Sequence, residues 1–360
     1  MKDITIVAGA RPNFMKIAPL VNELSKRSSQ LFKFSLVHTG QHYDKKMSGD
    51  FFEQLNIPNP KINLMAKGNS HSELTASIMI AFEKYLMNNK TDLVIVVGDV
   101  TSTMACAIVA KKLNIKVAHI EGGIRSGDFN MPEEINRIVT DSISDFFFTT
   151  STNAGHNLIK SGHRKENIFF VGNTMIDTLS NNINKLIKPK VWYEKKLNKN
   201  NFLLMTLHRP DNVDKEKTLI RIINDLVISS NNTLIIFPVH PRTKKNLMKF
   251  KNQNNLILID PLSYLEFIFL LKNSIGIITD SGGITEEATV LNVPCITLRN
   301  NTERPETVSI GTNELVGIKT HKIKTYMKKL LSNKWKKGSI PELWDGKTSK
   351  RIIDILEEII

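Results

Sequence analysis

The feature that most constrains this chain is a repeated alternation of short apolar runs with longer amphipathic stretches. The apolar runs have the length and composition of β-strands, whereas the stretches between them carry apolar residues at helical spacing. This alternation predicts an α/β protein built on doubly wound parallel sheets. The predicted strands are residues 4–8, 34–38, 93–97, 116–120, 146–149 and 168–171 and, after an interruption, residues 202–207, 234–237, 256–259, 275–279 and 295–298.

The interruption indicates two domains. A chain of 360 residues suits two cores of about 150 to 180 residues each better than one. Residues 172–201 are rich in Asn, Lys and Ile and carry weak strand signals, which favours a helix and an inter-domain connection. We predict an N-terminal Rossmann-like domain at residues 1–171 and a C-terminal one at residues 172–340. Residues 341–360 contain an amphipathic helix that packs across the domain boundary or at a subunit contact.

The loop after strand 275–279 has the composition of an anion site. Asp280, Ser281, Gly282 and Gly283 separate this strand from a helix at residues 284–291. Glycines let the main chain approach a ligand and a helix N-terminus attracts negative charge, so a phosphate or diphosphate fits here. An isolated serine before two glycines is more often an ordinary helix cap. The charged residues nearby favour the site over the cap, namely Glu286, Glu287, Arg299 and Arg304.

Other strands of the second half also end in polar residues. His208 and Arg209 follow strand 202–207, and His240 follows strand 234–237. Because the carboxyl ends of parallel strands meet at one edge of a sheet, we expect these side chains near the same ligand. A lone histidine is more often structural, but Arg209 beside His208 adds a second donor for a diphosphate.

The first half begins with cations at a helix start. Arg11 precedes Pro12 in the loop after strand 4–8, and Lys16 follows it. The second and third glycines of the dinucleotide fingerprint are missing, which removes the main support for a nicotinamide or flavin cofactor. Two cations near a helix start suit a phosphate or an anionic sugar, although both can also be merely exposed. The loop after the next strand adds two polar candidates, Gln41 and His42.

Three carboxylates in the first half indicate acid–base chemistry. Asp99 and Glu121 follow strands 93–97 and 116–120, at equivalent places on consecutive strands. If those strands are neighbours, about 5 Å separates them and the carboxylates converge. Glu133 lies in the first turn of a helix, where acids are common without any function. A site that moves protons on opposite faces of one carbon needs differently placed carboxyl groups, which these three residues supply.

The overall composition, 41% hydrophobic and 7% aromatic, is typical of a soluble protein. Lys and Arg outnumber Asp and Glu by 49 to 35, but the excess of +14 lies in Asn- and Lys-rich stretches without interleaved aromatic residues. We therefore expect an anionic small-molecule partner and no nucleic acid. Cys106 and Cys295 indicate neither a disulfide nor a metal site. The first strand begins near residue 1 and the apolar run 267–271 is short, so we expect no signal peptide, no membrane span and a cytoplasmic location.

With these residues assembled, the chain resembles the non-hydrolysing UDP-N-acetylglucosamine 2-epimerase family. The resemblance covers nearly the whole chain and rests on motifs in the family's order: GARPNFMKIAPL, TGQHYD, GDVTSTMACA, HIEGGIRSGD, MPEEINR, HRPDN, DSGGITEEA and TERPE. It implies the GT-B fold, in which two Rossmann-like domains face a central cleft. It also implies reversible C2 epimerisation of UDP-N-acetylglucosamine to UDP-N-acetylmannosamine, a precursor of surface polysaccharides, without metal or nicotinamide. The implied route is anti-elimination of UDP to a 2-acetamidoglucal, followed by re-addition of UDP.

The resemblance implies that Arg11, Lys16, Asp99, Glu121, Glu133, His208, Ser281, Glu287 and Arg304 carry the site. Together with the residues singled out above, it leads to two groups of predictions. The catalytic residues are Asp99, Glu121, Glu133 and His208. The substrate-binding residues are Arg11, Lys16, Gln41, His42, Arg209, His240, Ser281, Gly282, Gly283, Glu287 and Arg304.

Two departures from the commonest members concern the surroundings of the substrate. Those members have His-Arg-Arg-Glu where this chain has His208, Arg209, Pro210 and Asp211, and their loop before Pro132 is longer. Both elements border the substrate and the second UDP-sugar that activates several bacterial members. The exact sugar and activation by a second UDP-N-acetylglucosamine therefore stay open. A homodimer is expected.

Three alternatives accompany this interpretation. The motifs HTGQHYD and MPEEINR also resemble the branch that acts on UDP-2,3-diacetamido-2,3-dideoxyglucuronate. A GT-B glycosyltransferase shares the fold and a C-terminal diphosphate site, but it needs an acceptor pocket and usually one base, whereas this chain offers clustered carboxylates. A non-catalytic module that binds anions or nucleic acid is supported only by the charge of +14.

Overall fold

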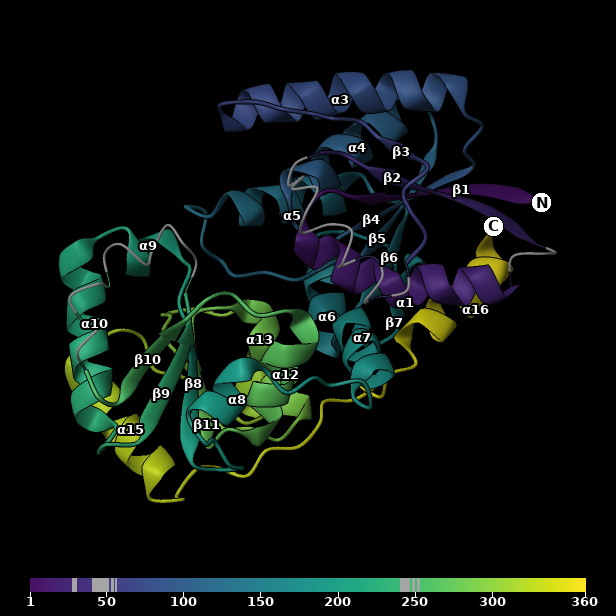
Figure 1. The fold of residues 1–360 in the computed structure, drawn as a ribbon. Helices are drawn as coiled ribbons and strands as arrows, with labels where there is room; N and C mark the ends of the chain where they lie inside the picture. The colour runs from purple at the N-terminus through teal and green to yellow at the C-terminus, as the bar shows by residue number, and fades with distance from the viewer. Residues whose placement is uncertain are drawn as a thin grey trace. The chain divides into compact units, whose positions relative to one another are not determined.

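The computed structural model describes residues 1–27, 31–40, 52, 55, 57–239, 247, 250 and 253–360, with Arg11 described by its main chain. The described residues form two compact units. The first comprises Met1–Asn181 and Glu342–Ile360, and the second comprises Asn182–Pro341. Each unit is built on one parallel sheet with helices packed against it (Figure 1).

In the described part of the first unit, seven strands lie in the order β3, β2, β1, β4, β5, β6, β7. The chain starts in the sheet with β1, moves outward to β2 and β3, and then crosses to the other side of β1. Ligands of such sheets bind at the carboxyl ends of the strands where the order reverses, here between β1 and β4. The strands are β1 Lys2–Ala8, β2 Phe32–His38, β3 Ile62–Asn63, β4 Leu93–Val97, β5 Lys116–Ile120, β6 Phe146–Thr149 and β7 Ile168–Phe170.

Helices cover both faces of this sheet (Figure 1). On one face α3, α4 and α5 pack side by side, and apolar side chains of β1 and β4 meet those of α3 and α4. On the other face α1 packs against α16. β4 is buried along its whole length, as expected for a strand covered on both faces. The helices are α1 Arg11–Arg27, α3 His71–Asn88, α4 Thr101–Lys112, α5 Pro132–Ile143, α6 Thr152–Lys160, α7 Thr174–Asn182 and α16 Thr348–Ile359.

The second unit repeats this plan with the described strand order β10, β9, β8, β11, β12, β13. The order reverses between β8 and β11, and the main core packs these strands against α10 and α15. The strands are β8 Phe202–Thr206, β9 Leu234–Pro238, β10 Leu256–Ile259, β11 Gly276–Thr279, β12 Cys295–Thr297 and β13 Asn313–Leu315. The helices are α8 Lys190–Glu194, α9 Pro210–Val213, α10 Glu216–Ser229, α12 Tyr264–Asn273, α13 Gly282–Val290, α14 Pro305–Ser309 and α15 Thr320–Leu331.

The predicted fold class, two doubly wound parallel α/β sheets, is confirmed by these strand orders. Each predicted strand is present with small shifts at its ends. The edge strands β3 and β13, which have 2 and 3 residues, were not predicted. Runs this short are too brief to show a clear period of two, and most of their residues are only partly buried or exposed.

The predicted domain boundary after residue 171 differs from the division between the units, because α7 belongs to the first unit. Asp177 on α7 is buried and accepts hydrogen bonds from the N–H groups of Thr348 and Ser349, at 3.0 and 2.7 Å. The hydroxyl of Thr178 donates to the carbonyl of Met15 on α1 at 2.5 Å. These buried contacts, which the sequence does not reveal, attach α7 to two other helices of the first unit.

The final segment of the chain also belongs to the first unit. Asp177 caps the first turn of α16, whose own cap residue, Lys347, makes no side-chain cap bond. The indole N–H of the buried Trp344 donates to the carbonyl of Thr150 at 3.0 Å. Arg27 on α1 pairs with Asp354 on α16 at 2.5 Å. A polar cap, a buried ring and an ion pair therefore attach the final segment to α7, to Thr150 after β6 and to α1.

Because Asp177 caps α16, we predict that removing its carboxylate causes a large loss of stability. Asp177→Ala leaves two buried N–H groups without an acceptor, which we expect to lower the free energy of unfolding by about 2 kcal/mol. Urea unfolding measures the change. The matched control is Asp354→Ala, which removes a partly exposed ion pair and should cost less than about 1 kcal/mol. Equal losses in the two variants would show that Asp177 does not act as a cap.

Candidate active site

The reversal of strand order in the first unit brings together the loops that follow β1 and β4. Gly9 lies in a space that admits no side chain, because a Cβ there would lie 2.0 Å from the Oγ of Ser102. Asn13 joins the two loops through its side-chain amide. Its Oδ1 accepts from the N–H of Ala10 at 3.1 Å, and its Nδ2 donates to the carbonyl of Val97 at 3.0 Å. The switch point is therefore fixed by packing and by one buried amide.

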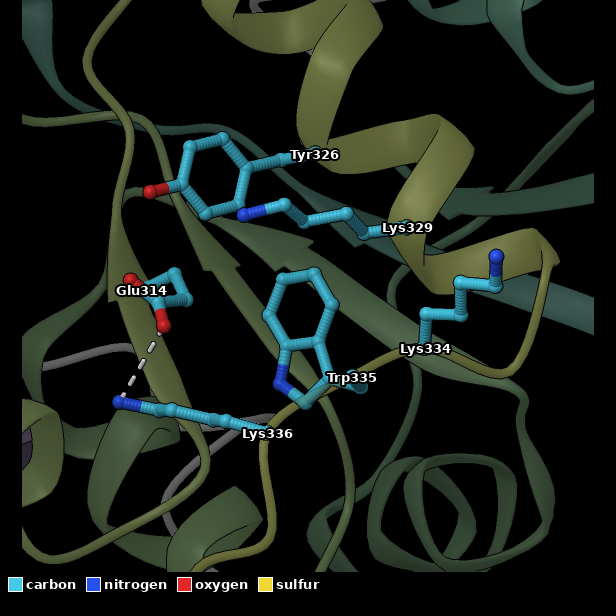
Figure 2. A pocket seen from close by; sticks show the side chains of 6 residues that line it. All are labelled: Glu314, Tyr326, Lys329, Lys334, Trp335 and Lys336. Atoms are coloured by element: carbon cyan, nitrogen blue, oxygen red, sulfur yellow. Dashed lines mark ion pairs between the residues drawn. The ribbon is translucent and has the colours of Figure 1, made fainter.

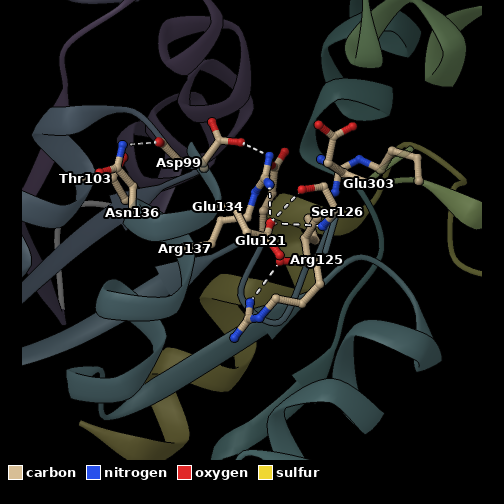
Figure 3. Close-up of polar contacts among 12 residues, drawn as sticks. Asp99, Thr103, Glu121, Arg125, Ser126, Glu134, Asn136, Arg137 and Glu303 are labelled. Atoms are coloured by element: carbon tan, nitrogen blue, oxygen red, sulfur yellow. Dashed lines mark hydrogen bonds and ion pairs between the residues drawn. The ribbon is translucent and has the colours of Figure 1, made fainter. Parts of the chain in front are cut away.

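Asp99, the first predicted catalytic carboxylate, lies in the loop after β4. Gly98 before it has φ +68°, a left-handed conformation that favours glycine. Two side chains of α5 hold Asp99 (Figure 3). Arg137 donates from Nη2 to its carboxylate at 2.5 Å, and Asn136 donates to its main-chain carbonyl at 2.8 Å. The carboxylate remains 27% exposed, so a ligand can reach it while Arg137 holds it.

Glu121, the second predicted carboxylate, lies at the tip of the neighbouring strand β5. Val97 of β4 is opposite Ile120 of β5, so the two loops begin at almost the same level. Glu121 has φ +72°, a conformation that costs a non-glycine residue about 1 to 3 kcal/mol and is often found at functional sites. Its side chain is buried, and its Oε2 accepts a charge-assisted hydrogen bond from Nζ of Lys16 at 2.7 Å. The structure thus brings together two predicted site residues from α1 and β5.

Helix α5 turns a buried polar face toward these loops (Figure 3). Glu134 accepts hydrogen bonds from the N–H groups of Ser126 and Gly127, both at 2.9 Å, and from Arg137 at 2.7 Å. Burial alone would raise the pKa of Glu134, but these hydrogen bonds outweigh it and the pKa lies below its ordinary value. The preceding residue, Glu133, is exposed, and its catalytic role stays a prediction.

Asp280 organises the corresponding place in the second unit, where it follows β11 and is fully buried. Its carboxylate accepts from the N–H groups of His208 and Arg209 at 3.1 and 3.0 Å, and from the side chain of Asn212 at 3.0 Å. Nδ1 of His208 lies 2.9 Å away. Burial alone would raise the pKa of Asp280, but the bonds from His208, Asn212 and Arg209 lower it. With Nδ1 held by Asp280, a ligand would meet the Nε2 edge of the exposed His208 ring.

The N-terminus of α13 lacks a side-chain cap. Ser281 stands at the N-cap position, yet its side chain makes no cap bond to the helix. The N–H groups of the first turn therefore need another acceptor, which a phosphate can provide. A Cβ on Gly282 would meet its nearest described atom, Oε2 of Glu303, at 3.8 Å, so the loop leaves space in front of this turn.

Two buried ion pairs flank this helix start. Arg299 donates to both carboxylate oxygens of Glu303 at 2.6 and 2.8 Å, and Arg304 pairs with Glu286. The neighbouring Glu287 is also buried. Burial raises the pKa of Glu287 to about 8, the Tyr264 hydroxyl opposes this rise, and the Glu286 carboxylate adds to it. Glu287 is therefore mainly protonated at pH 7 and can donate a hydrogen bond.

Several predicted site residues cannot be placed in this arrangement. Gln41, His42 and His240 lie outside the described residues, as does the side chain of Arg11. Conversely, the residues that hold the predicted ones, Asn136, Arg137 and Asn212, were not predicted, nor was the role of Asp280 in holding the loop after β8. Arg137 and Asp280 lie within the motifs MPEEINR and DSGGITEEA, which are the signal that could have identified them.

A separate hollow in the second unit is lined by Glu314, Tyr326, Lys329, Lys334, Trp335 and Lys336 (Figure 2). It lies beside the edge strand β13 and helix α15, whereas the predicted diphosphate site lies at β8 and β11. Within the described ranges, no group of three or more His, Cys, Asp or Glu side chains could hold a metal ion. No helix in the described part of the chain is long and apolar enough to cross a membrane.

Comparisons with known proteins identify the family of this chain. A family model described as UDP-N-acetylglucosamine 2-epimerase matches residues 23–357. A UDP-N-acetylglucosamine 2-epimerase of Methanocaldococcus jannaschii is 42% identical over 366 residues, covering 98% of each chain. A UDP-2,3-diacetamido-2,3-dideoxy-D-glucuronate 2-epimerase of Pseudomonas aeruginosa is 38% identical over 320 residues, covering 88% of each. The crystal structure of the Methanocaldococcus jannaschii enzyme with UDP-GlcNAc and UDP matches with a TM-score of 0.88 over 99% of both chains.

The lowered pKa values of Glu134 and Asp280 predict a loss of stability in acid. Both groups have a folded pKa below the values of 4.5 and 3.8 expected for the unfolded chain. Their stabilisation is therefore complete above about pH 5 and is lost as the pH falls through these values toward the folded pKa. We expect the urea midpoint to fall between about pH 5 and pH 3, and to fall less steeply in Asp280→Asn.

The control for this pH series is Asp211→Asn, which neutralises an exposed carboxylate in the same segment as His208. It should show the wild-type pH dependence. An Asp280→Asn variant that loses stability as steeply as the wild type would contradict the assignment of the acid sensitivity to Asp280.

Proposed function

We propose that this chain, which belongs to the UDP-N-acetylglucosamine 2-epimerase family, interconverts UDP-N-acetylglucosamine and UDP-N-acetylmannosamine. A carboxylate takes the proton from C2 of the sugar, a C1–C2 double bond forms, and the C1–O bond breaks with its electron pair leaving on UDP. UDP then adds back to C1 of the 2-acetamidoglucal while a second carboxyl group delivers a proton to the opposite face of C2. Atoms and charge balance without an external oxidant or reductant.

The observation that carries this proposal is the pair of carboxylates at neighbouring strand tips. Asp99 and Glu121 follow β4 and β5, and each is held by a cation from a different helix, Arg137 and Lys16 respectively. Two carboxyl groups with different burial and different partners can act as base and acid toward the two faces of one carbon. The exposed Glu133 is the third candidate for these steps.

The second unit supplies the proposed nucleotide site. The first-turn N–H groups of α13, next to Ser281, would bind the diphosphate together with His208 and Arg209. Glu287 would donate or accept a hydrogen bond to the nucleoside, and Arg304 would add positive charge near Ser281, Gly282 and Gly283. Nδ1 of His208 donates to Asp280, which leaves Nε2 to act on the leaving phosphate.

A second substrate is supported by one specific comparison, the relative from Pseudomonas aeruginosa that is named a diacetamido-glucuronate 2-epimerase. Its sugar would undergo the same proton transfer at C2. Side-by-side kcat/KM values for the two UDP-sugars decide between them, and we expect the higher value with UDP-N-acetylglucosamine. A glycosyltransferase would instead consume the UDP-sugar only when an acceptor is added.

Three finer expectations belong to the same proposal. We propose a homodimer in the cytoplasm, and light scattering of the purified protein measures its mass in solution.

Activation by a second UDP-N-acetylglucosamine is tested from the reverse direction. If it operates, UDP-N-acetylmannosamine alone reacts slowly and a trace of UDP-N-acetylglucosamine accelerates it, whereas without activation the reverse reaction starts without a lag and the added trace does not accelerate it.

The proposed roles of Asp99 and Glu121 predict large rate losses in variants that keep the fold. Asp99→Asn and Glu121→Gln should each lower turnover by about 10²-fold or more, because each removes an acid–base group while preserving shape. Proton NMR of UDP-N-acetylglucosamine, incubated without an acceptor, follows the anomeric signals of substrate and product. Glu166→Gln, an exposed residue in the same unit, should keep the wild-type rate. Near-normal rates in both active-site variants would remove these residues from the mechanism.

The proposed diphosphate site predicts weaker nucleotide binding in variants of the second unit. Ser281→Ala, His208→Ala and Arg304→Ala should each weaken UDP binding by about 1.5 to 3 kcal/mol, the value of a charge-assisted contact. Calorimetric titration with UDP measures this without any chemistry. Ser332→Ala, an exposed hydroxyl after α15, is the control and should bind UDP normally. Unchanged affinity in all three variants would place the diphosphate elsewhere.

A further inference from the structure

His119 of β5 connects the loops that follow β4 and β5 through its ring. It is fully buried, and both of its ring nitrogens are within hydrogen-bonding distance of a partner. Nε2 lies 2.8 Å from the main-chain carbonyl of Gly98, the residue before Asp99. Nδ1 lies 2.7 Å from Oδ1 of Asp141 on α5.

The partners determine which ring nitrogens carry protons. A main-chain carbonyl can only accept, so Nε2 of His119 must donate to Gly98. Asp141 also accepts through Oδ2, from the N–H of Gly123 at 3.1 Å and from Arg125 at 2.5 Å. The contact with the Arg125 guanidinium and the bond from the Gly123 N–H both favour the ionised form of this carboxylate. An ionised Asp141 accepts at both oxygens, so Nδ1 of His119 must also carry a proton.

The Gly98 peptide and the loop after Glu121 both depend on this group. A Cβ on Gly98 would lie 3.0 Å from Nζ of Lys16 and 3.7 Å from Oε2 of Glu121. Gly98 therefore packs against the ion pair between Lys16 and Glu121. On the other side, Asp141 holds the N–H of Gly123, two residues after Glu121. The ring thus links the main chain next to Asp99 with the main chain next to Glu121.

We propose that His119 is a buried imidazolium and a positioning residue for the epimerase reaction, which ties the Gly98–Asp99 peptide to Asp141. The inference rests on the proposed function for its catalytic consequence, but its protonation state does not depend on any activity. Among the described residues, Asp141 on α5 contacts the ring directly, and Arg125 in the loop after β5 contacts Asp141. The Lys16–Glu121 pair lies close to Gly98. A ring with two N–H groups has no acceptor atom left, so it fixes both partners as acceptors.

Nitrogen-15 NMR of the full chain with labelled histidine tests the protonation state. The His119 signals are identified by their absence from the spectrum of His119→Asn. At pH 7 we expect both ring nitrogens of His119 to give the chemical shifts of protonated nitrogens. An unprotonated Nδ1, with the proton on Asp141, or an unprotonated Nε2 would overturn the proposal whether or not the protein is active.

A matched pair of variants tests the positioning role. The amide nitrogen of Gln reaches the place of Nε2, so His119→Gln keeps a donor for Gly98, whereas His119→Asn offers its amide at Nδ1 and loses the Gly98 contact. We expect kcat to fall by about 10- to 100-fold in His119→Asn with KM changed less than about twofold, and by a smaller factor in His119→Gln. His156→Gln, an exposed histidine on α6, should behave as the wild type.

A purely structural role would give a different pattern. Both variants would then lose thermal stability while the folded fraction kept the wild-type kcat, and that result would overturn the positioning role. Equal losses of kcat in the Asn and Gln variants would likewise show that the Gly98 contact is not the one that matters. If the wild type itself has no epimerase activity, the proposed function fails, and the NMR result still decides the state of His119.

Discussion

The first unit depends on one constraint: two neighbouring parallel strands must end in left-handed turns at Gly98 and Glu121, and these turns must be held in place. Glycine meets the requirement at position 98, but Glu121 adopts the conformation at a cost. Helix α5 supplies part of the compensation through polar side chains on its buried face, Glu134, Asn136, Arg137 and Asp141. In a helix that packs on a sheet, this face would ordinarily be apolar. The buried face of α5 is polar because its side chains hold the loops that follow β4 and β5.

The second unit also uses a buried polar side chain to hold a loop at the end of a strand. Asp280 is buried at the tip of β11 and binds the main chain at His208 and Arg209, so one carboxylate shapes the loop of the neighbouring strand. A buried ion pair adds little to stability compared with an apolar pair, because both charges lose their hydration. Networks of this kind are better understood as devices that fix geometry. The free energy lost on dehydrating these charges is tolerated where a loop must hold a catalytic or binding group in one position.

Much of the fold followed from the sequence because the central strands are apolar and end in polar loops. Asp99 and Glu121 follow consecutive strands and were expected to converge if those strands were neighbours, and the register shows that β4 and β5 are neighbours. The partners of these residues could not be predicted in the same way. Which of two adjacent acids on α5 turns inward depends on helix rotation, and the structure buries Glu134 and exposes Glu133. The attachment of α7 to the first unit likewise depends on particular buried contacts, those of Asp177 with α16 and of Thr178 with α1.

The central claim is that the carboxylates at these strand tips exchange the proton at C2 of a UDP-sugar. The most direct measurement is the deuterium content at C2 of the product formed from UDP-N-acetylglucosamine in deuterated water, taken at low conversion. The account predicts that the product carries deuterium at C2, because the carboxyl group that protonates the intermediate exchanges with solvent. Product that keeps its original C2 proton would contradict the account, since the hydrogen would then have moved without passing through an exchangeable side chain.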